Sequence, residues 1–429
     1  MDSKSSLPLR YLLVVWLGVL SAIAFLDRTN ISVAGIAISR EFGISNTRLG
    51  WVFSAFLIGY AVFQVPAGML ARRLGPRRLL AFAGIWWAFF TTLTAAVPAG
   101  LSVAVPLLIL VRLALGAGEA TMYPAASQFV ERWFPIAERG RANGIIFAGV
   151  GLGSGLTPYI VTLILLHLGW RASFWISAVV GLAGALIWYV IARDTPEQHS
   201  QISPAERERI VATRDLSTQA TSTISQRRIP WSRLLRSREV LALAGSYFSF
   251  GYVAWIYFAW LFIYLAQVRG LNLKSSALYT TLPFIAMTIG CLVGGIISDA
   301  IASRFGIRAG RTIVPGCALA VTAVLLIVGS RAHEARSAAL VLALGAGVLY
   351  LAQSAFWAVA ADIGGENTSI VSAVVNMGAQ LGGATVASLT PVIANHYGWT
   401  MSFVVAAMLA LGGGVAWLLI DPRRRITAF

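Results

Sequence analysis

The chain has 429 residues, of which 58% are hydrophobic and only 12% are charged, and its formal net charge is +16. Soluble domains carry about 25% charged residues, and apolar runs of bilayer length recur here from end to end. The composition therefore excludes a soluble protein and predicts an integral, multi-pass membrane protein. The arginines gather in loops on one side of the membrane, as the positive-inside rule requires, so we expect contacts with membrane lipids and no nucleic-acid partner.

The apolar runs predict an all-α fold of twelve transmembrane helices. We expect an N-terminal six-helix half (1–192), a cytoplasmic linker with a short helix capped by Ser203 (193–238), and a C-terminal six-helix half (239–429). The basic loops predict that both termini are cytoplasmic. The expected spans are 11–33, 49–70, 79–97, 102–124, 142–166, 172–192, 240–266, 279–300, 312–330, 337–361, 371–394 and 401–420.

The first span carries a polar group of residues inside its apolar run. Asp27 and Asn30 are three residues apart and share a helix face, and Arg28 is turned about 100° from Asp27. One interpretation is that these residues simply face water near the outer half of the span. Because the apolar sequence resumes after them, we favour a cluster that faces a cavity inside the protein.

The fourth span contains one arginine and one glutamate, Arg112 and Glu119, in an otherwise apolar stretch. Seven residues are almost two helical turns, so both side chains project from the same face at membrane depth. Charges at that depth usually mark the path of an ion or substrate. The alternative is a buried ion pair that only joins two helices.

The fifth span has alternating glycines from Gly149 to Gly155. Such a run can form a phosphate-binding loop, but only between a strand and a helix, and this run lies inside a bilayer-length segment. We expect the glycines to let helices approach closely.

An internal repeat supports the division into halves. The hexapeptide LALGAG occurs at 113–118 and again at 342–347, and in that register Arg112 and Glu119 correspond to Val341 and Val348. The ionisable pair is therefore not needed to build a six-helix bundle, which indicates a specialised site in the first half. The second half offers aromatic and neutral polar groups: Tyr247, Tyr257, Ser354, Trp357, Asn376 and Gln380.

Twelve spans in two halves and the turn 68–78 resemble the major facilitator superfamily. Four further motifs are more specific: Asp27-Arg28-Thr29-Asn30, the pair Arg112 and Glu119, Arg132-Trp133-Phe134-Pro135, and Thr195-Pro196-Glu197. Together they resemble the anion:cation symporter family of that superfamily, which includes bacterial sugar-acid/proton symporters, aromatic-acid carriers, and the vesicular glutamate and sialic acid transporters.

The resemblance implies roles for individual residues. It implies that Arg28 binds a substrate carboxylate with help from Tyr60, that Asp27 and Glu119 carry protons, and that Arg112 tunes their proton affinity. Asn30 belongs to the expected cavity-facing cluster, so we include it among the substrate-binding candidates. Ser354, Trp357 and Asn376 are expected to contact the substrate from the second half.

Two positions depart from a sugar-acid carrier. Leu152 stands where a hydrogen-bonding glutamine is expected, and Phe356 stands where a small hydroxyl residue is expected. Both substitutions make the expected pocket more apolar. They favour an aromatic or less hydroxylated acid over a polyhydroxy substrate.

The sequence thus predicts a proton-coupled symporter of a small organic carboxylate, either a sugar acid such as an aldonate or hexuronate, or an aromatic acid. An uncoupled or exchange-type carrier and a membrane anion sensor that does not transport stay open. We expect no enzyme activity, no bound metal, and no cofactor other than the coupling proton. The strong preference for arginine over lysine favours a bacterial inner membrane, and we expect a monomer.

Overall fold

The computed structural model describes residues 8–135, 138–211, 236–364 and 368–424. Every regular element in these ranges is helical, and twelve helices are long and apolar enough to cross a membrane. An α-helix satisfies its backbone hydrogen bonds within itself, which is why so apolar a chain crosses a bilayer as helices. The predicted all-α fold with twelve spans is confirmed.

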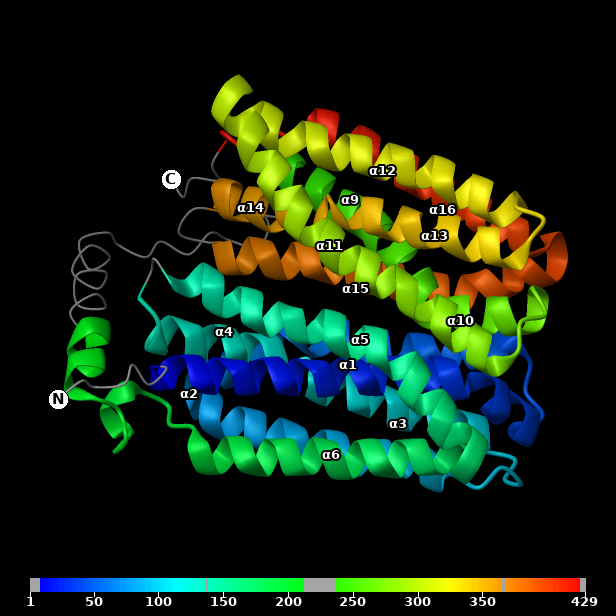
Figure 1. Ribbon diagram of the computed structural model, residues 1–429, viewed down its shortest axis with the longest axis horizontal. Coiled ribbons are helices and arrows are strands. Elements are labelled where there is room, and N and C mark those ends of the chain that lie inside the picture. Colours follow the sequence, from blue (N-terminus) through cyan, green and yellow to red (C-terminus); the bar gives the residue numbers. More distant parts are fainter. Residues whose placement is uncertain (1–7, 136–137, 212–235, 365–367, 425–429) are drawn as a thin grey trace.

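The first six spans form the N-terminal half, the lower layer in Figure 1. Gly75 divides α2 into two spans, because its φ of 77° lies outside the helical region and in the region that favours glycine. The helices are α1 (Leu9–Phe42), α2 (Asn46–Ala96), α3 (Ala104–Glu119), α4 (Met122–Trp133), α5 (Arg139–Leu168) and α6 (Trp170–Ile191).

The last six spans form the C-terminal half, the upper layer in Figure 1. A short 3₁₀ turn, η2 (Pro196–Gln198), follows the first half. The elements of the second half are α9 (Arg238–Ala259), α10 (Leu261–Ile263), η3 (Tyr264–Val268), α11 (Leu273–Phe305), α12 (Ile307–Arg331), α13 (Ala335–Tyr350), α14 (Gln353–Gly364), α15 (Thr368–Tyr397), α16 (Trp399–Ala416) and η5 (Trp417–Leu419).

The fourth and tenth spans are broken at matching places. α3 has 16 residues and α4 has 12, and the same lengths recur in α13 and α14. Each break follows shortly after one copy of the LALGAG hexapeptide, so the sequence repeat is also a structural one. In the first half the break comes directly after Glu119, which therefore ends its helix at membrane depth.

The glycines of the fifth span serve close helix packing, as expected. A Cβ added at Gly149 would lie 2.0 Å from the carbonyl oxygen of Gly18 on α1, and one at Gly153 would lie 2.2 Å from that of Ala22. Gly151 faces the other half instead, where a Cβ would lie 2.3 Å from the hydroxyl of Thr288 on α11. Only glycine permits contacts this close.

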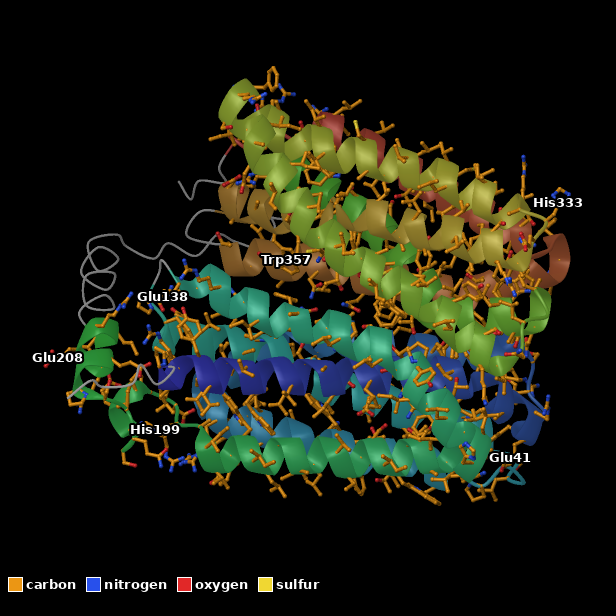
Figure 2. All side chains as sticks on the ribbon, in the orientation of Figure 1. Glu41, Glu138, His199, Glu208, His333 and Trp357 are labelled. Carbon is orange, nitrogen blue, oxygen red and sulfur yellow. The ribbon has the colours of Figure 1, made fainter. Side chains whose placement is uncertain are left out.

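The two ends of the bundle are distinguished by labelled residues in Figure 2. Glu138 and His199 lie at the end that the arginine-rich loops predict to be cytoplasmic, and Glu41 and His333 lie at the opposite, predicted outer end. The N-terminal half packs against the C-terminal half mainly through α2 with α15 and α5 with α11.

The halves are held together toward the predicted outer end. Ser32, Ser54 and Thr281 each donate a side-chain hydroxyl to a backbone carbonyl of the other half, at 2.7–2.9 Å. Near the loops, Asn46 bonds to Gln267 and Asn395 bonds to Thr47, both at 3.3 Å. These bonds make the structure a state that is closed at the predicted outer end.

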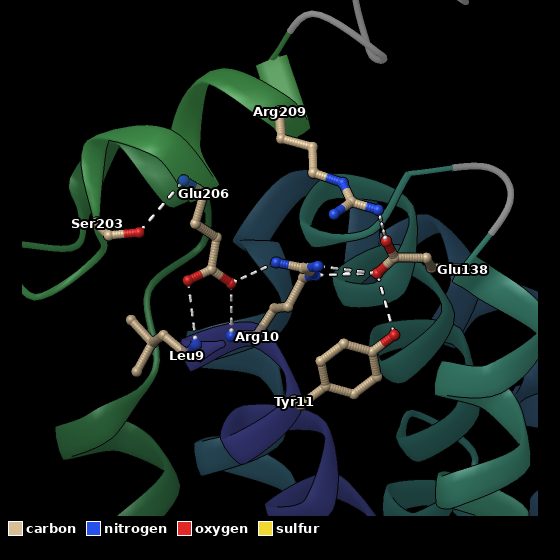
Figure 3. Close-up of polar contacts among 7 residues, drawn as sticks. All are labelled: Leu9, Arg10, Tyr11, Glu138, Ser203, Glu206 and Arg209. Atoms are coloured by element: carbon tan, nitrogen blue, oxygen red, sulfur yellow. Dashed lines mark hydrogen bonds and ion pairs between the residues drawn. The ribbon is translucent and has the colours of Figure 1, made fainter. Parts of the chain in front are cut away.

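The linker helix, residues 204–211, docks on the N-terminal half (Figure 3). Ser203 accepts a hydrogen bond from the backbone N–H of Glu206, which confirms the predicted cap. The Glu206 carboxylate accepts from the backbone N–H groups of Leu9 and Arg10, at 3.1 and 3.2 Å, and from the Arg10 side chain at 2.8 Å. Glu206 therefore caps the start of α1 from another element.

Glu138 completes this set of contacts, which we call the linker clasp: Arg10, Tyr11, Glu138, Glu206 and Arg209. Glu138 accepts from Arg10 at 3.0 and 3.1 Å, from the Tyr11 hydroxyl at 3.0 Å and from Arg209 at 2.6 Å. Burial alone would raise the pKa of Glu138, but the hydrogen bonds from Arg10 and Tyr11 and the nearby positive charges outweigh it and lower that pKa. The clasp fixes the linker helix to the first half, while 212–235 lie outside the described residues and the limits of the linker stay a prediction.

Candidate functional site

A buried ion pair between α1 and α3 forms the centre of the candidate site. The Arg28 Nε donates to Glu119 Oε2 at 2.7 Å, and the two side chains are only 3% and 0% exposed. Sequence spacing suggested that Glu119 shares a face with Arg112, but the structure pairs it with Arg28. One oxygen of Glu119 (Oε1) and one nitrogen of Arg28 (Nη2) are buried without a partner.

Aromatic rings surround the Arg28 guanidinium. Its central carbon lies 4.6 Å from the ring centroid of Phe25, 4.8 Å from that of Tyr60 and 5.5 Å from that of Phe56. Rings at this distance attract a cation through their quadrupole, and they hold the guanidinium in place without occupying its N–H groups. Tyr60 therefore lies beside Arg28, and the substrate-binding role that the resemblance implies for it stays a prediction.

Arg112 lies beside the same Phe56 ring as Arg28. The guanidinium carbon of Arg112 is 5.0 Å from the centroid of that ring, and Arg112 is 2% exposed. Its Nε is buried without a partner, and it takes part in none of the hydrogen bonds or ion pairs found among the described residues. A buried guanidinium with unused N–H groups is ready to bind an anion.

Asp27 is buried on α1 and points toward α2. Its Oδ2 accepts a hydrogen bond from Thr91 at 3.3 Å, and its Oδ1 has no partner. Among the described residues no basic side chain comes within ion-pair distance of it. Asp27 therefore differs from Glu119, which is neutralised by a direct contact with Arg28.

A small cavity lies between the two halves beside these charges. From the first half it is lined by Arg28, Arg112 and Phe56, among others. From the second half it is lined by Trp255 and Phe258 of α9 and by Ala387 of α15, with Ala259. The cavity is thus charged on one wall and apolar on the other.

Two predicted residues of the first half lie elsewhere. Asn30 donates to Ser177 at 3.3 Å and accepts from Ser173 at 2.8 Å, so both ends of its amide are held by α6. Leu152 is 62% exposed and is not part of the cavity lining. It lies on roughly the opposite side of α5 from the buried Ser154. The structure gives the predicted substrate contacts of Asn30 and Leu152 no support.

The predicted residues of the second half lie outside this cavity too. Phe356 is 1% exposed and packs in an aromatic cluster, 4.5 Å from Tyr247 and 5.0 Å from Trp417 between ring centroids. Trp357 (Figure 2) contacts the same tyrosine at 6.0 Å. The hydroxyl of Ser354 is buried without a partner, and Asn376 is partly exposed. Their substrate contacts stay predictions.

Sequence reasoning missed Phe56, Thr91, Trp255 and Phe258. Phe56 could have been found, because it lies one helical turn before Tyr60 and so shares its face. The other three are ordinary residues of apolar helices, and only the packing of distant segments brings them to the site.

Twelve spans in two repeated halves, with buried charges beside a cavity between them, define a secondary transporter of the internal-repeat type. The family model of the Major Facilitator Superfamily matches residues 17–387. This chain belongs to that superfamily, whose members are transporters and not enzymes.

Curated relatives of the chain are named as anion transporters. A probable sulfoacetate transporter of Cupriavidus necator is 31% identical and aligns over 98% of this chain and 95% of its own length. The hexuronate transporter of Bacillus subtilis is 28% identical over 97% and 94% of the two chains. A probable L-galactonate transporter of Escherichia coli is 32% identical over 72% and 69%.

Solved structures share the fold. A bacterial homologue of the human lysosomal transporter Spinster, in an inward-facing and unoccupied conformation, matches with a TM-score of 0.77 at 18% identity and covers 99% of this chain and all of its own. A D-xylose–proton symporter matches with a TM-score of 0.72 at 15% identity, over 97% of this chain and all of its own. The predicted fold is confirmed by both.

Proposed function

We propose that this protein is a proton-coupled symporter that carries a small organic anion across the membrane, with Arg28 as the anion-binding residue. The names of its relatives support an organic acid as the substrate. We place it in the inner membrane of a bacterium, as a monomer with both termini in the cytoplasm.

The buried pair of Arg28 and Glu119 carries this proposal. An arriving carboxylate competes with Glu119 for the guanidinium, and Glu119 is then left buried without its counter-ion. An uncompensated charge in such a place costs several kcal/mol, so a displaced Glu119 takes up a proton instead. Anion binding and proton binding thereby favour each other, which is the linkage that a symporter needs.

Asp27 offers a second proton-binding group beside the same arginine. It has a free oxygen and no ion-pair partner among the described residues. The halves then rock about the site to expose it alternately at the two ends. Among the described residues, the hydrogen bonds that join the halves at the predicted outer end and must break for this motion are uncharged.

Uptake into proteoliposomes tests the proposal. A panel of aldonates, hexuronates, hydroxybenzoates and short dicarboxylates is offered with and without an inwardly directed proton gradient, and accumulation should require the gradient. Glu119→Gln should abolish accumulation but keep binding or exchange, whereas Arg28→Ala should abolish binding. Glu334→Gln, which changes an exposed carboxylate at the predicted outer end, is the matched control.

The outcome separates the alternatives. Normal accumulation by Glu119→Gln would show that this residue does not couple protons. Uptake by the wild-type protein that ignores the gradient would identify an uncoupled or exchange carrier, and binding without any uptake would identify a sensor.

A further inference from the structure

We propose that the substrate is a compact dianion, with two acidic groups and few hydroxyls, and that it is carried together with two protons. This proposal rests on the symport function proposed above and adds the substrate class and the stoichiometry.

The first support is that two separate guanidinium groups face one small cavity. Arg28 uses its Nε for Glu119 and leaves Nη2 without a partner, and Arg112 leaves its Nε without one. The ring of Phe56 lies within 5.5 Å of both guanidinium carbons, so the two groups are close enough for one short ligand to reach both. One carboxylate could occupy either arginine, but only a second acidic group would satisfy the other.

The second support is the apolar wall opposite the arginines. Trp255, Phe258 and Ala387 provide no side-chain acceptor for a hydroxyl group, and the hydroxyl of Ser32 is already engaged with the carbonyl of Ala259 at 2.8 Å. A sugar acid would bury several hydroxyls against this wall without partners, at a cost for each of them. A short acid without those hydroxyls avoids the cost.

The third support is the charge balance of the buried site. Arg28 and Arg112 bring two positive charges, and Asp27 and Glu119 can bring two negative ones, so the empty site is neutral when both carboxylates are ionised. Each negative charge that a ligand adds is compensated when one carboxyl group takes a proton. Two carboxyl groups can take two protons, which compensate two ligand charges. The loaded and empty sites are then equally neutral, and transport of the dianion moves no net charge.

Binding to the purified protein tests the substrate class. Malonate, succinate and sulfoacetate are each compared by calorimetry with the corresponding monoamide, which keeps the shape and loses one charge. A lost charge-assisted hydrogen bond should weaken binding roughly tenfold or more. Arg112→Gln should remove this preference for the dianion, whereas Arg331→Gln, at the exposed predicted outer end of α12, should keep it.

Equal binding of all three dianions and their monoamides would overturn the proposal. So would an Arg112→Gln variant that melts as a folded protein and keeps the full preference. If that variant does not fold, the proposal is decided by two other results: the binding of each dianion and its monoamide to the wild-type protein, and the proton count.

The proton count is measured in proteoliposomes. We expect two protons per dianion and an initial rate that does not change when a potassium gradient with valinomycin imposes a membrane potential. A single proton, or a rate that follows the potential, would overturn the stoichiometry. Proton-driven uptake of monoanions at the same affinity would refute the dianion and leave the symporter standing. A strong dianion preference without proton-dependent uptake would refute the symporter and leave the dianion as the substrate class.

Discussion

Gly50, near the start of α2, offers a direct way to perturb the state that is closed at the predicted outer end. A Cβ at this position would lie 2.3 Å from the carbonyl oxygen of Ala387 and 3.2 Å from side-chain atoms of both Pro391 and Trp260. All three neighbours belong to the C-terminal half. Because the nearest atom is part of the α15 backbone, it cannot move aside alone, and Gly50→Ala can relieve the contact only by separating the halves.

The size of the effect follows from the cost of overpacking. An added methyl group in a well-packed contact costs about 1–3 kcal/mol. If the open state does not contain this contact, the ratio of closed to open molecules should fall roughly 5- to 150-fold. Some molecules should stay closed at the predicted outer end, but a second population that is open there should become detectable.

Distances between spin labels at Thr47 and Asn395 report this ratio, since these side chains are hydrogen-bonded across the halves at 3.3 Å. The two native cysteines are first replaced by serine. Gly50→Ala should add a population with longer distances. Gly68→Ala, in the same helix but with no atom within 4 Å of the new Cβ, should not. An unchanged distribution for a folded Gly50→Ala protein would refute the reasoning.

Two further predictions concern the predicted cytoplasmic end. Because hydrogen bonds from Arg10 and Tyr11 outweigh burial and lower the pKa of Glu138, the clasp should be fully stable above the ordinary glutamate pKa and weaken as the pH falls through the lowered one. Amide exchange of 204–211 over a pH series checks this, and Glu138→Gln should remove the dependence. Gly75→Ala should lower the melting temperature more than Gly169→Ala. Both glycines have φ near 80°, so the backbone strain of an added Cβ is similar at the two positions. Only at Gly75 would the Cβ also meet a carboxylate, that of Asp194, at 2.5 Å. An equal fall in melting temperature for the two variants would contradict a role for the contact with Asp194.

The fold was predictable because hydropathy has one simple consequence in a bilayer. A run of about twenty apolar residues must become a helix, and twelve such runs separated by polar loops leave little choice of architecture. Helix ends were less predictable. The first apolar run predicted a span over 11–33, but α1 extends to Phe42, past Arg40 and Glu41. A helix can continue beyond the apolar layer of the membrane, because its charged side chains then lie in water.

The charged residues of the site were predictable for a related reason. Arg28, Arg112 and Glu119 are costly in an apolar segment, so their presence alone indicates a site. Their partners were not predictable. The contact of Arg28 with Glu119 depends on how α1 packs against α3, and the amide of Asn30 is bound by two serines of α6 that no local pattern connects to it.

The distribution of charge between the halves has a consequence for the motion. No ion pair found among the described residues joins the two halves: each lies within one half or joins the linker helix to the N-terminal half, and the hydrogen bonds found between the halves are uncharged. Breaking a buried ion pair would add several kcal/mol to the barrier, whereas a hydroxyl–carbonyl bond contributes only about 1 kcal/mol. In the proposed mechanism the anion binds to the half that carries both arginines and both carboxyl groups, so its charge is compensated within that half. The apolar wall of α9 and α15 can then move away from the loaded site without separating any charges.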